Sequence, residues 1–457
     1  MRQGFLSINP ATGEAFAQHA MLDAAATDAV LDQAVRGQAG WRDLPFETRA
    51  AALYRAALLL RERAEDLARL ITMEMGKPIV QARGEVEKCA GLCDWYATQG
   101  PALLADEALD VGDDGTARVC WQPLGIVLGV MPWNFPLWQV LRAAVPILLA
   151  GNGFALKHSD NVQGCAAKLA ELLADAGVPE GVFVNLPIAQ DAIADLIGDR
   201  RIAAVTVTAG VGAGSAIAAE AGRQIKKTVL ELGGIDPFIV LADADLDMAA
   251  AAAVRARFLN GGQVCIAAKR LIVEASVLEE FTAKFVAGTE ALAIGDPLDE
   301  ATFVGPLARP RGRDDLHAYV QATVHAGAQL LLGGAPIEGV GNYYAPTVLA
   351  GVTPGMAASC NELFGPVAAI LVADDADHAV ALANDSDFGL SAALWCGDPD
   401  RADALARGIE TGAVFVNGIS ASDPRVPIGG IKRSGYGREL SYFGLREFTN
   451  AKLIWSR

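Results

Sequence analysis

The chain has 457 residues, of which 52% are hydrophobic and 20% are charged, and its formal net charge is −17. This balance is typical of a folded globular protein with two or three domains and excludes a disordered chain. The negative charge disfavours nucleic acids and anionic membranes as partners, because basic surfaces bind such polyanions.

The cysteines and the apolar segments of the chain indicate that the protein lies in a reducing compartment and outside the membrane. Residues 1–10 lack the apolar run of a signal peptide. The most apolar region, residues 124–156, is interrupted by prolines, asparagines and an arginine, so it does not read as a membrane span. Seven scattered cysteines favour reduced thiols over a disulfide framework, and Cys89 and Cys93 are interpreted as packing groups. We therefore expect a cytoplasmic protein without a metal site.

The first part of the chain is expected to be helical. Residues 47–71 carry apolar side chains at steps of three or four, which predicts one amphipathic helix, and residues 79–96 predict a second. Residues 101–123 differ, because they combine acidic residues, glycines and an alternating segment. This pattern predicts an exposed hairpin or arm suited to oligomerisation.

From residue 125 onward, apolar strands alternate with helices. Continuous apolar strands of this kind indicate a parallel sheet covered on both faces, with ligands at the C-terminal ends of the strands. This half of the chain is therefore interpreted as nucleotide-binding. The predicted strands are 125–131, 154–157, 182–186, 203–208 and 227–232, and the predicted helices are 137–150, 165–176, 191–197 and 215–222.

A second α/β set follows after a short boundary near residues 232–237. The tail, residues 434–457, holds four aromatic residues, which is too many for a free end. We expect this tail to pack, with a partner subunit as the leading interpretation. The second set comprises strands 237–241 and 270–274, helices 245–258 and 278–292, and further units from 316–326 to 413–416.

Cys265 is the first candidate for catalysis. It follows an alanine-rich helix and the glycine pair Gly261 and Gly262. Glycine accepts positive φ and lets the backbone approach a ligand, which suits a nucleophile presented on a tight loop. A cysteine that only fills space does not need those glycines, although most free cysteines are inert packing groups.

Two polar residues at strand ends are candidate partners for this thiol. Asn134 lies between two prolines directly after a predicted strand, where its amide could stabilise an oxyanion or satisfy the loop backbone. Glu231 ends an otherwise apolar strand, so burial would raise its pKa toward that of a general base. The alternative for Glu231 is an ion pair with Lys226 or Lys227.

Together, five motifs resemble the NAD(P)-dependent aldehyde dehydrogenases in order and spacing across essentially the whole chain. The motifs are Trp133-Asn134-Phe135-Pro136, Glu231-Leu232-Gly233-Gly234, Gly262-Gln263-Val264-Cys265, Glu362-Leu363-Phe364-Gly365-Pro366 and Gly429-Gly430-Ile431-Lys432-Arg433-Ser434-Gly435.

The resemblance implies an α/β fold with three parts. A Rossmann-type NAD(P)-binding domain would comprise residues 1–102 and 124–232. Residues 233–432 would form an α/β catalytic domain. Residues 103–123 and 433–457 would form a small β oligomerisation arm and tail, in a homodimer or homotetramer.

The resemblance also implies roles for single residues. Cys265 would attack an aldehyde carbonyl, Asn134 and the Cys265 N–H would bind the oxyanion, and Glu231 would activate the water that hydrolyses the thioester. The family positions that contact the cofactor correspond to Trp133, Lys157, Glu362 and Phe364 in this chain.

The pyrophosphate loop departs from the family pattern. Gly210 replaces the usual serine, which removes a hydroxyl contact, while Gly214 and the N–H groups of the following helix remain available. Asp160 lies three residues after Lys157, at a position where a carboxylate favours NAD over NADP in the family that this chain resembles. His158 could instead accept a phosphate, so we expect NAD, with NADP as a second candidate.

The substrate expectation rests mainly on Arg142, eight residues after Asn134 on a predicted apolar helix. It matches an arginine that binds the distal carboxylate in succinate-semialdehyde dehydrogenases, and the short bacterial forms of that family are the most similar. Ser422 and Arg425 match positions in the loop that closes the substrate tunnel in that family. A guanidinium–carboxylate contact would select an ω-carboxylated aldehyde. The alternative is that Arg142 pairs with an internal carboxylate.

These residues predict the oxidation of succinate semialdehyde to succinate. Another small aldehyde or semialdehyde is the first alternative. A CoA-acylating dehydrogenase is a second, although Glu231 argues against it because a base for water would waste the thioester. A catalytically silent protein on the same fold is the third.

Overall fold

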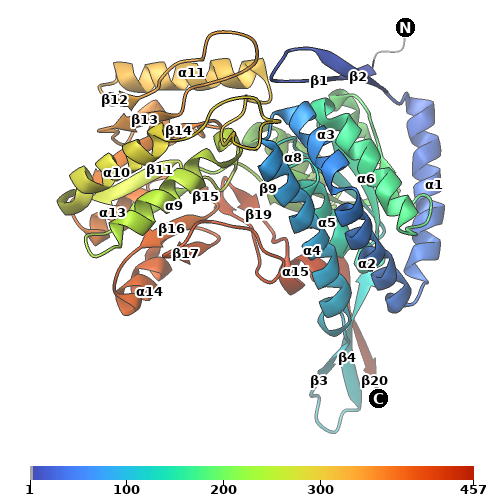
Figure 1. The fold of residues 1–457 in the computed structure, drawn as a ribbon. Helices are drawn as coiled ribbons and strands as arrows, with labels where there is room; N and C mark the ends of the chain where they lie inside the picture. Colours follow the sequence, from blue (N-terminus) through green and yellow to red (C-terminus); the bar gives the residue numbers. More distant parts are fainter. Residues whose placement is uncertain (1–3) are drawn as a thin grey trace.

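The computed structural model describes residues 4–457. The first expected domain begins at residue 1, so its residues 1–3 lie outside the described part. The described chain forms two large mixed sheets, each flanked by helices, and a smaller sheet that projects from the body (Figure 1).

The first large sheet has six strands in the order β19-β9-β8-β5-β6-β7. The five strands from β9 to β7 are parallel, and every residue of β6 is buried, as continuous apolar strands predict. The strands are β5 (Ile126–Met131), β6 (Gly153–His158), β7 (Phe183–Asn185), β8 (Ile202–Thr208), β9 (Lys227–Glu231) and β19 (Gly435–Tyr436), and the connecting helices are α5 (Trp138–Leu149), α6 (Gln163–Asp175), α7 (Ile193–Gly198) and α8 (Val211–Arg223).

The N-terminal segment forms a hairpin and four helices. The expected single helix over residues 47–71 is wrong, because the backbone leaves helical geometry at Arg63 and a new helix begins at Ala64. Periodicity could not reveal this break, since Leu60 and Leu67 on either side of it enter the same core. The second helix extends beyond residue 96 to Leu103. The elements are β1 (Gly4–Ile8), β2 (Ala15–Ala20), α1 (Ala24–Arg42), α2 (Phe46–Glu62), α3 (Ala64–Met75) and α4 (Ile79–Leu103).

The second large sheet has seven strands in the order β12-β13-β14-β11-β10-β16-β17, and only β12 is antiparallel to its neighbour. Its strands are β10 (Pro237–Val240), β11 (Arg270–Glu274), β12 (Gln329–Leu332), β13 (Thr347–Ala350), β14 (Val367–Ala373), β16 (Ala392–Trp395) and β17 (Val414–Val416). Its helices are α9 (Leu246–Phe258), α10 (Leu278–Glu290), α11 (Pro310–His325), α12 (Ala357–Cys360), α13 (Ala376–Asn384) and α14 (Pro399–Gly408), and a short ladder joins β15 (Phe388–Gly389) to β18 (Ile431–Lys432).

The arm expected over residues 101–123 is a three-stranded antiparallel sheet that projects from the body (Figure 1). It contains β3 (Glu107–Leu109), β4 (Thr116–Pro123) and the C-terminal strand β20 (Thr449–Ser456). The aromatic tail is divided between two sheets, because β19 pairs with β9 while β20 pairs with β4. Helix α15 (Ser441–Glu447) connects these two strands.

Within residues 4–457, none of the helices combines the length and the apolar character needed to cross a membrane.

Candidate active site

Cys265 lies in a loop that begins with three residues in left-handed conformation. The φ angles are 54° at Asn260, 61° at Gly261 and 73° at Gly262, as the glycine pair predicted. A side chain at Gly262 would place its Cβ 2.2 Å from the carbonyl oxygen of Gly365. The loop therefore depends on glycine both for its backbone conformation and for its packing against the segment that follows Phe364.

The side chain of Lys269 holds the cysteine loop in place, although the sequence alone did not identify this residue. Its buried ammonium donates hydrogen bonds to the carbonyls of Val264 (2.9 Å) and Cys265 (2.5 Å). The same nitrogen lies 3.3 Å from a carboxylate oxygen of Glu362. A lysine close before the apolar residues 271–273 of β11 was the signal that could have identified it.

The Cys265 thiol is protonated at neutral pH. Burial raises its pKa to about 11, while the charges of Arg142 and Lys269 act in the opposite direction. A thiolate is the reactive form of cysteine, so this site needs a group that accepts the thiol proton.

Asn134 lies against the cysteine loop, in the segment that follows β5. Its side-chain amide donates to the carbonyl of Gln263 at 3.0 Å, and the Asn260 amide donates to the Asn134 carbonyl at 2.8 Å. Asn134 is only 4% exposed. The two segments are thus held together at the C-terminal edge of the first sheet, where an amide donor was expected.

One cavity of about 230 Å³ is lined by six of the thirteen expected site residues. It lies between the first sheet and the cysteine loop and is open to solvent. The expected residues that line it are Trp133, Asn134, Gly210, Cys265, Glu362 and Phe364, joined by Pro132, Gln139, Thr208, Ala209, Leu232 and Gly233.

Glu231 ends strand β9, directly before two residues that line this cavity. Burial raises its pKa to about 8, against the opposing charge of Arg142. Its Oε1 atom has no hydrogen-bond partner among the described residues. Neither expected lysine pairs with it, because Lys226 donates to backbone carbonyls and Lys227 pairs with Glu447.

Arg142 has the internal partner that the sequence left open as an alternative to substrate. Its guanidinium forms an ion pair with Glu439, and its Nη2 atom lies 3.8 Å from the Glu231 carboxylate. The residue is 2% exposed and does not line the cavity of Cys265. Glu439 was missed, since its position in the aromatic tail gave no sign that it would reach α5.

The loop between β17 and β18 holds the other two expected substrate residues. Arg425 is exposed and pairs with Asp423 at 2.7 Å. Ser422 is buried, and its hydroxyl accepts a hydrogen bond from the Lys88 ammonium at 2.7 Å. Lys88 was also missed; it lies on α4 between the exposed Glu87 and the buried Cys89, so its position in the helix gave no sign that it would reach Ser422.

The residues expected to hold a dinucleotide fit that purpose. Lys157 lies near the end of β6 and forms an ion pair with Asp160 at 2.6 Å, which brings together two residues expected to bind the ribose. Gly210 caps the N-terminus of α8 and has open space where a side chain would lie. A helix N-terminus with free N–H groups binds phosphate.

Two aromatic rings and one glycine shape the rest of the space that a dinucleotide would fill. Trp133 and Phe364 lie edge to face across the cavity, with ring centroids 5.7 Å apart. A Cβ at Gly214 would clash with Leu232, so that glycine allows α8 to pack closely. The site therefore offers flat apolar walls beside an anion-binding helix end.

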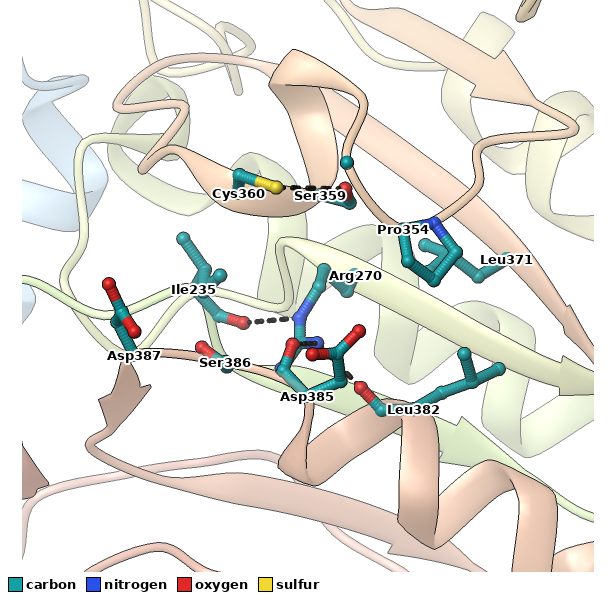
Figure 2. Close-up of a pocket in the computed structure, with 11 residues that line it drawn as sticks. Ile235, Arg270, Pro354, Ser359, Cys360, Leu371, Leu382, Asp385, Ser386 and Asp387 are labelled. Carbon is teal, nitrogen blue, oxygen red and sulfur yellow. Dashed lines mark hydrogen bonds between the residues drawn. The ribbon is translucent and has the colours of Figure 1, made fainter.

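A second cavity, of about 380 Å³, lies beside the second large sheet and contains none of the expected site residues (Figure 2). Arg270 is its central polar group, but its guanidinium donates to the carbonyls of Ile235, Leu382 and Ala383. Cys360, which also lines this cavity, forms a hydrogen bond between its thiol and the Ser359 hydroxyl at 3.4 Å. These groups are already satisfied and bring no base to the thiol.

Comparisons with known proteins agree with this geometry. The model described as "Aldehyde dehydrogenase family" matches residues 2–454. The chain is 54% identical to a succinate semialdehyde dehydrogenase of Escherichia coli strain K12, named as using NAD(P)+, over 98% of this chain and 97% of that one. It is 49% identical to a probable NADP+ succinate-semialdehyde dehydrogenase of Synechocystis, over 98% and 99% of the two chains.

Solved structures of related proteins have the same fold as this chain. The fold superposes on that of Gox0499 with a TM-score of 0.98, at 39% identity and over 99% of this chain and 100% of the other. A succinic semialdehyde dehydrogenase from Streptococcus pyogenes, solved with NADP+ as the cofactor, gives a TM-score of 0.97 at 36% identity, over 99% of each chain.

Proposed function

Because the chain belongs to the aldehyde dehydrogenase family, we propose that it oxidises succinate semialdehyde to succinate with NAD(P)+ as the electron acceptor. The observation that carries this proposal is the single cavity that joins Cys265, Asn134 and the segment after Glu231. The substrate follows from the names of relatives up to 54% identical over nearly the whole chain.

The reaction begins at the thiol. Cys265 loses its proton and its sulfur attacks the aldehyde carbon, which converts the carbonyl oxygen to an oxyanion. The Asn134 amide and the Cys265 N–H donate hydrogen bonds to that oxygen, and a positioned donor of this kind lowers the barrier by about 3–4 kcal/mol. Glu231, with a pKa near 8, is the group suited to accept the thiol proton.

The cofactor supplies an acceptor for the hydride that leaves the aldehyde carbon. Lys157, Asp160 and Glu362 would hold its riboses, the α8 N-terminus at Gly210 its pyrophosphate, and Trp133 and Phe364 would flank its reactive ring. Gly214 supports this arrangement by letting α8 pack closely on Leu232. Asp160 favours NAD, because a carboxylate repels a 2′-phosphate.

Hydrolysis completes the cycle. Glu231 first releases the thiol proton to solvent and then takes a proton from a water molecule, which attacks the thioester carbon. The C–S bond breaks, succinate leaves, and Glu231 returns that proton to the Cys265 sulfur. A buried carboxylate with a raised pKa is a stronger base than an exposed one, which suits it to this step. Arg142 pairs with Glu439 and lies 3.8 Å from Glu231, so we assign Arg142 to orienting the base rather than to the substrate.

We place the protein in the cytoplasm as a homodimer or homotetramer. All seven cysteines are free, which fits a reducing compartment. The arm exposes Leu453 and Trp455, and the stacked rings of Tyr442 and Phe443 are also exposed beside it. These apolar side chains on a projecting sheet are suited to a second copy of the chain.

The test is NADH or NADPH formation by the purified chain with succinate semialdehyde, butanal and other aldehydes. We expect kcat/KM to be highest for succinate semialdehyde and to be independent of CoA. Cys265→Ala should lower turnover by at least about 10⁴-fold, whereas Cys360→Ser should not change it. A parent enzyme that prefers butanal, or that needs CoA, would refute the proposal.

A further inference from the structure

Two polar side chains on α4 reach the segments that carry the oxyanion donors. Gln81 and Glu85 are four positions apart, so they lie on one face of this helix. The side-chain oxygen of Gln81 accepts a hydrogen bond from the backbone N–H of Asn260 at 2.8 Å, and its amide donates to the carbonyl of Phe303 at 2.8 Å. Gln81 thereby ties α4 to the start of the cysteine loop.

Glu85 holds the segment that follows Asn134. One oxygen of its carboxylate accepts hydrogen bonds from the backbone N–H groups of Leu137 and Trp138, both at 2.9 Å. These N–H groups open helix α5, and Leu137, at the N-cap, has no polar side chain to satisfy them. A carboxylate also matches the positive end of the helix dipole. Helix α4 therefore supplies the cap that fixes where α5 begins, three residues after Asn134.

The ammonium of Lys77 completes this cap. It forms an ion pair with the Glu85 carboxylate, and both side chains are 1% exposed. The same ammonium lies 3.6 Å from the centre of the Phe135 ring, directly after Asn134. A buried carboxylate is tolerated when a cation and hydrogen-bond donors surround it. The pair therefore remains in the interior while it contacts three of the four residues that follow Asn134.

These contacts close a ring that passes through both sides of the oxyanion site. The Asn260 amide donates to the Asn134 carbonyl at 2.8 Å, and the Asn134 amide donates to the Gln263 carbonyl at 3.0 Å, two residues before the thiol. From α4 the ring runs through Asn260, Asn134 and the start of α5, and then back to α4. The spacing between Asn134 and the cysteine loop therefore depends on a helix whose side chains do not line the reaction cavity.

We propose that Gln81 and Glu85 are positioning residues that set the distance between the Asn134 amide and the Cys265 N–H. This inference rests on the proposed function, in which both groups donate to the oxyanion. A misplacement of about 1 Å in a reacting site can lower the rate about 100-fold. Helix α4 packs against α2, α3 and α5, so it is a rigid support for two loop segments.

The first experiment replaces Gln81 by methionine, which removes both of its hydrogen bonds, and by glutamate, which keeps the oxygen that accepts from Asn260. Gln81→Met should lower kcat by about tenfold with little change in KM, because the lost hydrogen bond shifts the oxyanion donors without removing them. Gln81→Glu should retain most of kcat. Tyr54→Phe is the matched control, because it removes a hydrogen bond to Thr98 near the other end of α4.

A double-mutant cycle separates positioning from a general effect on the fold. If Gln81 acts through Asn134, Gln81→Met should have no further effect on kcat in the Asn134→Ala chain, whereas an independent effect would add to it. Glu85→Leu, which removes the cap of α5, should behave in the same way. If Glu85→Leu does not fold, the two Gln81 variants decide the question.

All rates are measured with the aldehyde that the parent oxidises best, so the result does not depend on the identity of the substrate. If Asn134→Ala leaves kcat unchanged, the proposed oxyanion step and this inference are both overturned. If Asn134→Ala lowers kcat, the inference alone is overturned by a Gln81→Met chain with the parent's kcat, by equal losses in both backgrounds, or by a Gln81→Glu chain as slow as Gln81→Met.

Discussion

Arg142 lies 3.8 Å from Glu231 through its Nη2 atom, although 89 positions separate them in the chain. The same guanidinium pairs with Glu439, so one buried cation serves two buried carboxylates. One guanidinium cannot neutralise two carboxylates, and burial raises the pKa of Glu231 to about 8. The Glu231 carboxylate therefore binds a proton more tightly than an exposed carboxylate does, which suits a group that accepts and releases protons as the reaction proceeds.

Replacing Arg142 with methionine should damage both stability and catalysis. Two buried carboxylates would lose their cation, and breaking a buried pair in this way costs about 3–5 kcal/mol of unfolding free energy. Turnover of succinate semialdehyde and butanal should fall by similar factors. Denaturant unfolding and the two kcat/KM values measure this, with Arg69→Met at an exposed pair as the control. A selective loss of succinate semialdehyde would instead place Arg142 at the substrate.

The rate should depend on pH through Glu231. A general base works in its deprotonated form, so kcat should rise as the pH increases through about 8 and should fall below it. In Glu231→Gln this step should disappear and hydrolysis should slow by about 10²–10⁴-fold. The thioester on Cys265 should then accumulate, which mass spectrometry of the quenched enzyme detects. A rate that does not change across neutral pH would contradict this role.

Asn134→Ala should lower kcat by about 10²–10³-fold with a smaller effect on KM, because the amide acts on the oxyanion rather than on the bound aldehyde. The substitution also removes the hydrogen bond to Gln263. Alkylation of Cys265 by iodoacetamide therefore serves as the control for loop geometry. An unchanged alkylation rate with reduced kcat supports oxyanion binding, and unchanged kcat excludes it.

Asp160→Ser should shift the cofactor preference toward NADP. Removing the carboxylate ends its repulsion of a 2′-phosphate, and an exposed charge contact of about 1 kcal/mol corresponds to about fivefold in kcat/KM. The ion pair with Lys157 would be lost at the same time, so kcat/KM for NAD should fall. Asp191→Ser is the matched control at a distant exposed aspartate. A parent that uses NADP as well as NAD would contradict the role of Asp160.

The sequence predicted the parts of the site that are local in the chain. The positive φ angles before Cys265 followed from its glycines, and Asn134 and Glu231 were placed at sheet edges because apolar strands precede them. The helix break at Arg63 was missed, since the apolar stripe continues through it.

Partners that are distant in the chain could not be predicted. A buried arginine needs a carboxylate, but the chain has 54 acidic residues and no pattern points from Arg142 to Glu439. The bond between Lys88 and Ser422 spans 334 positions and joins α4 to a loop near the end of the chain. Such contacts depend on how the helices and loops pack, which periodicity does not specify.

The pairing of β19 with β9 has a consequence for synthesis of the protein. Gly435 pairs with Glu231, the Leu232 N–H donates to the Ser434 carbonyl at 2.9 Å, and Glu439 follows on the same segment. Domains begin to fold while the ribosome is still adding residues. Cys265 therefore leaves the ribosome before the segment that pairs with Glu231. We expect a nascent chain, or one cleaved before Gly435, to carry the thiol while it cannot yet complete the oxidation of an aldehyde.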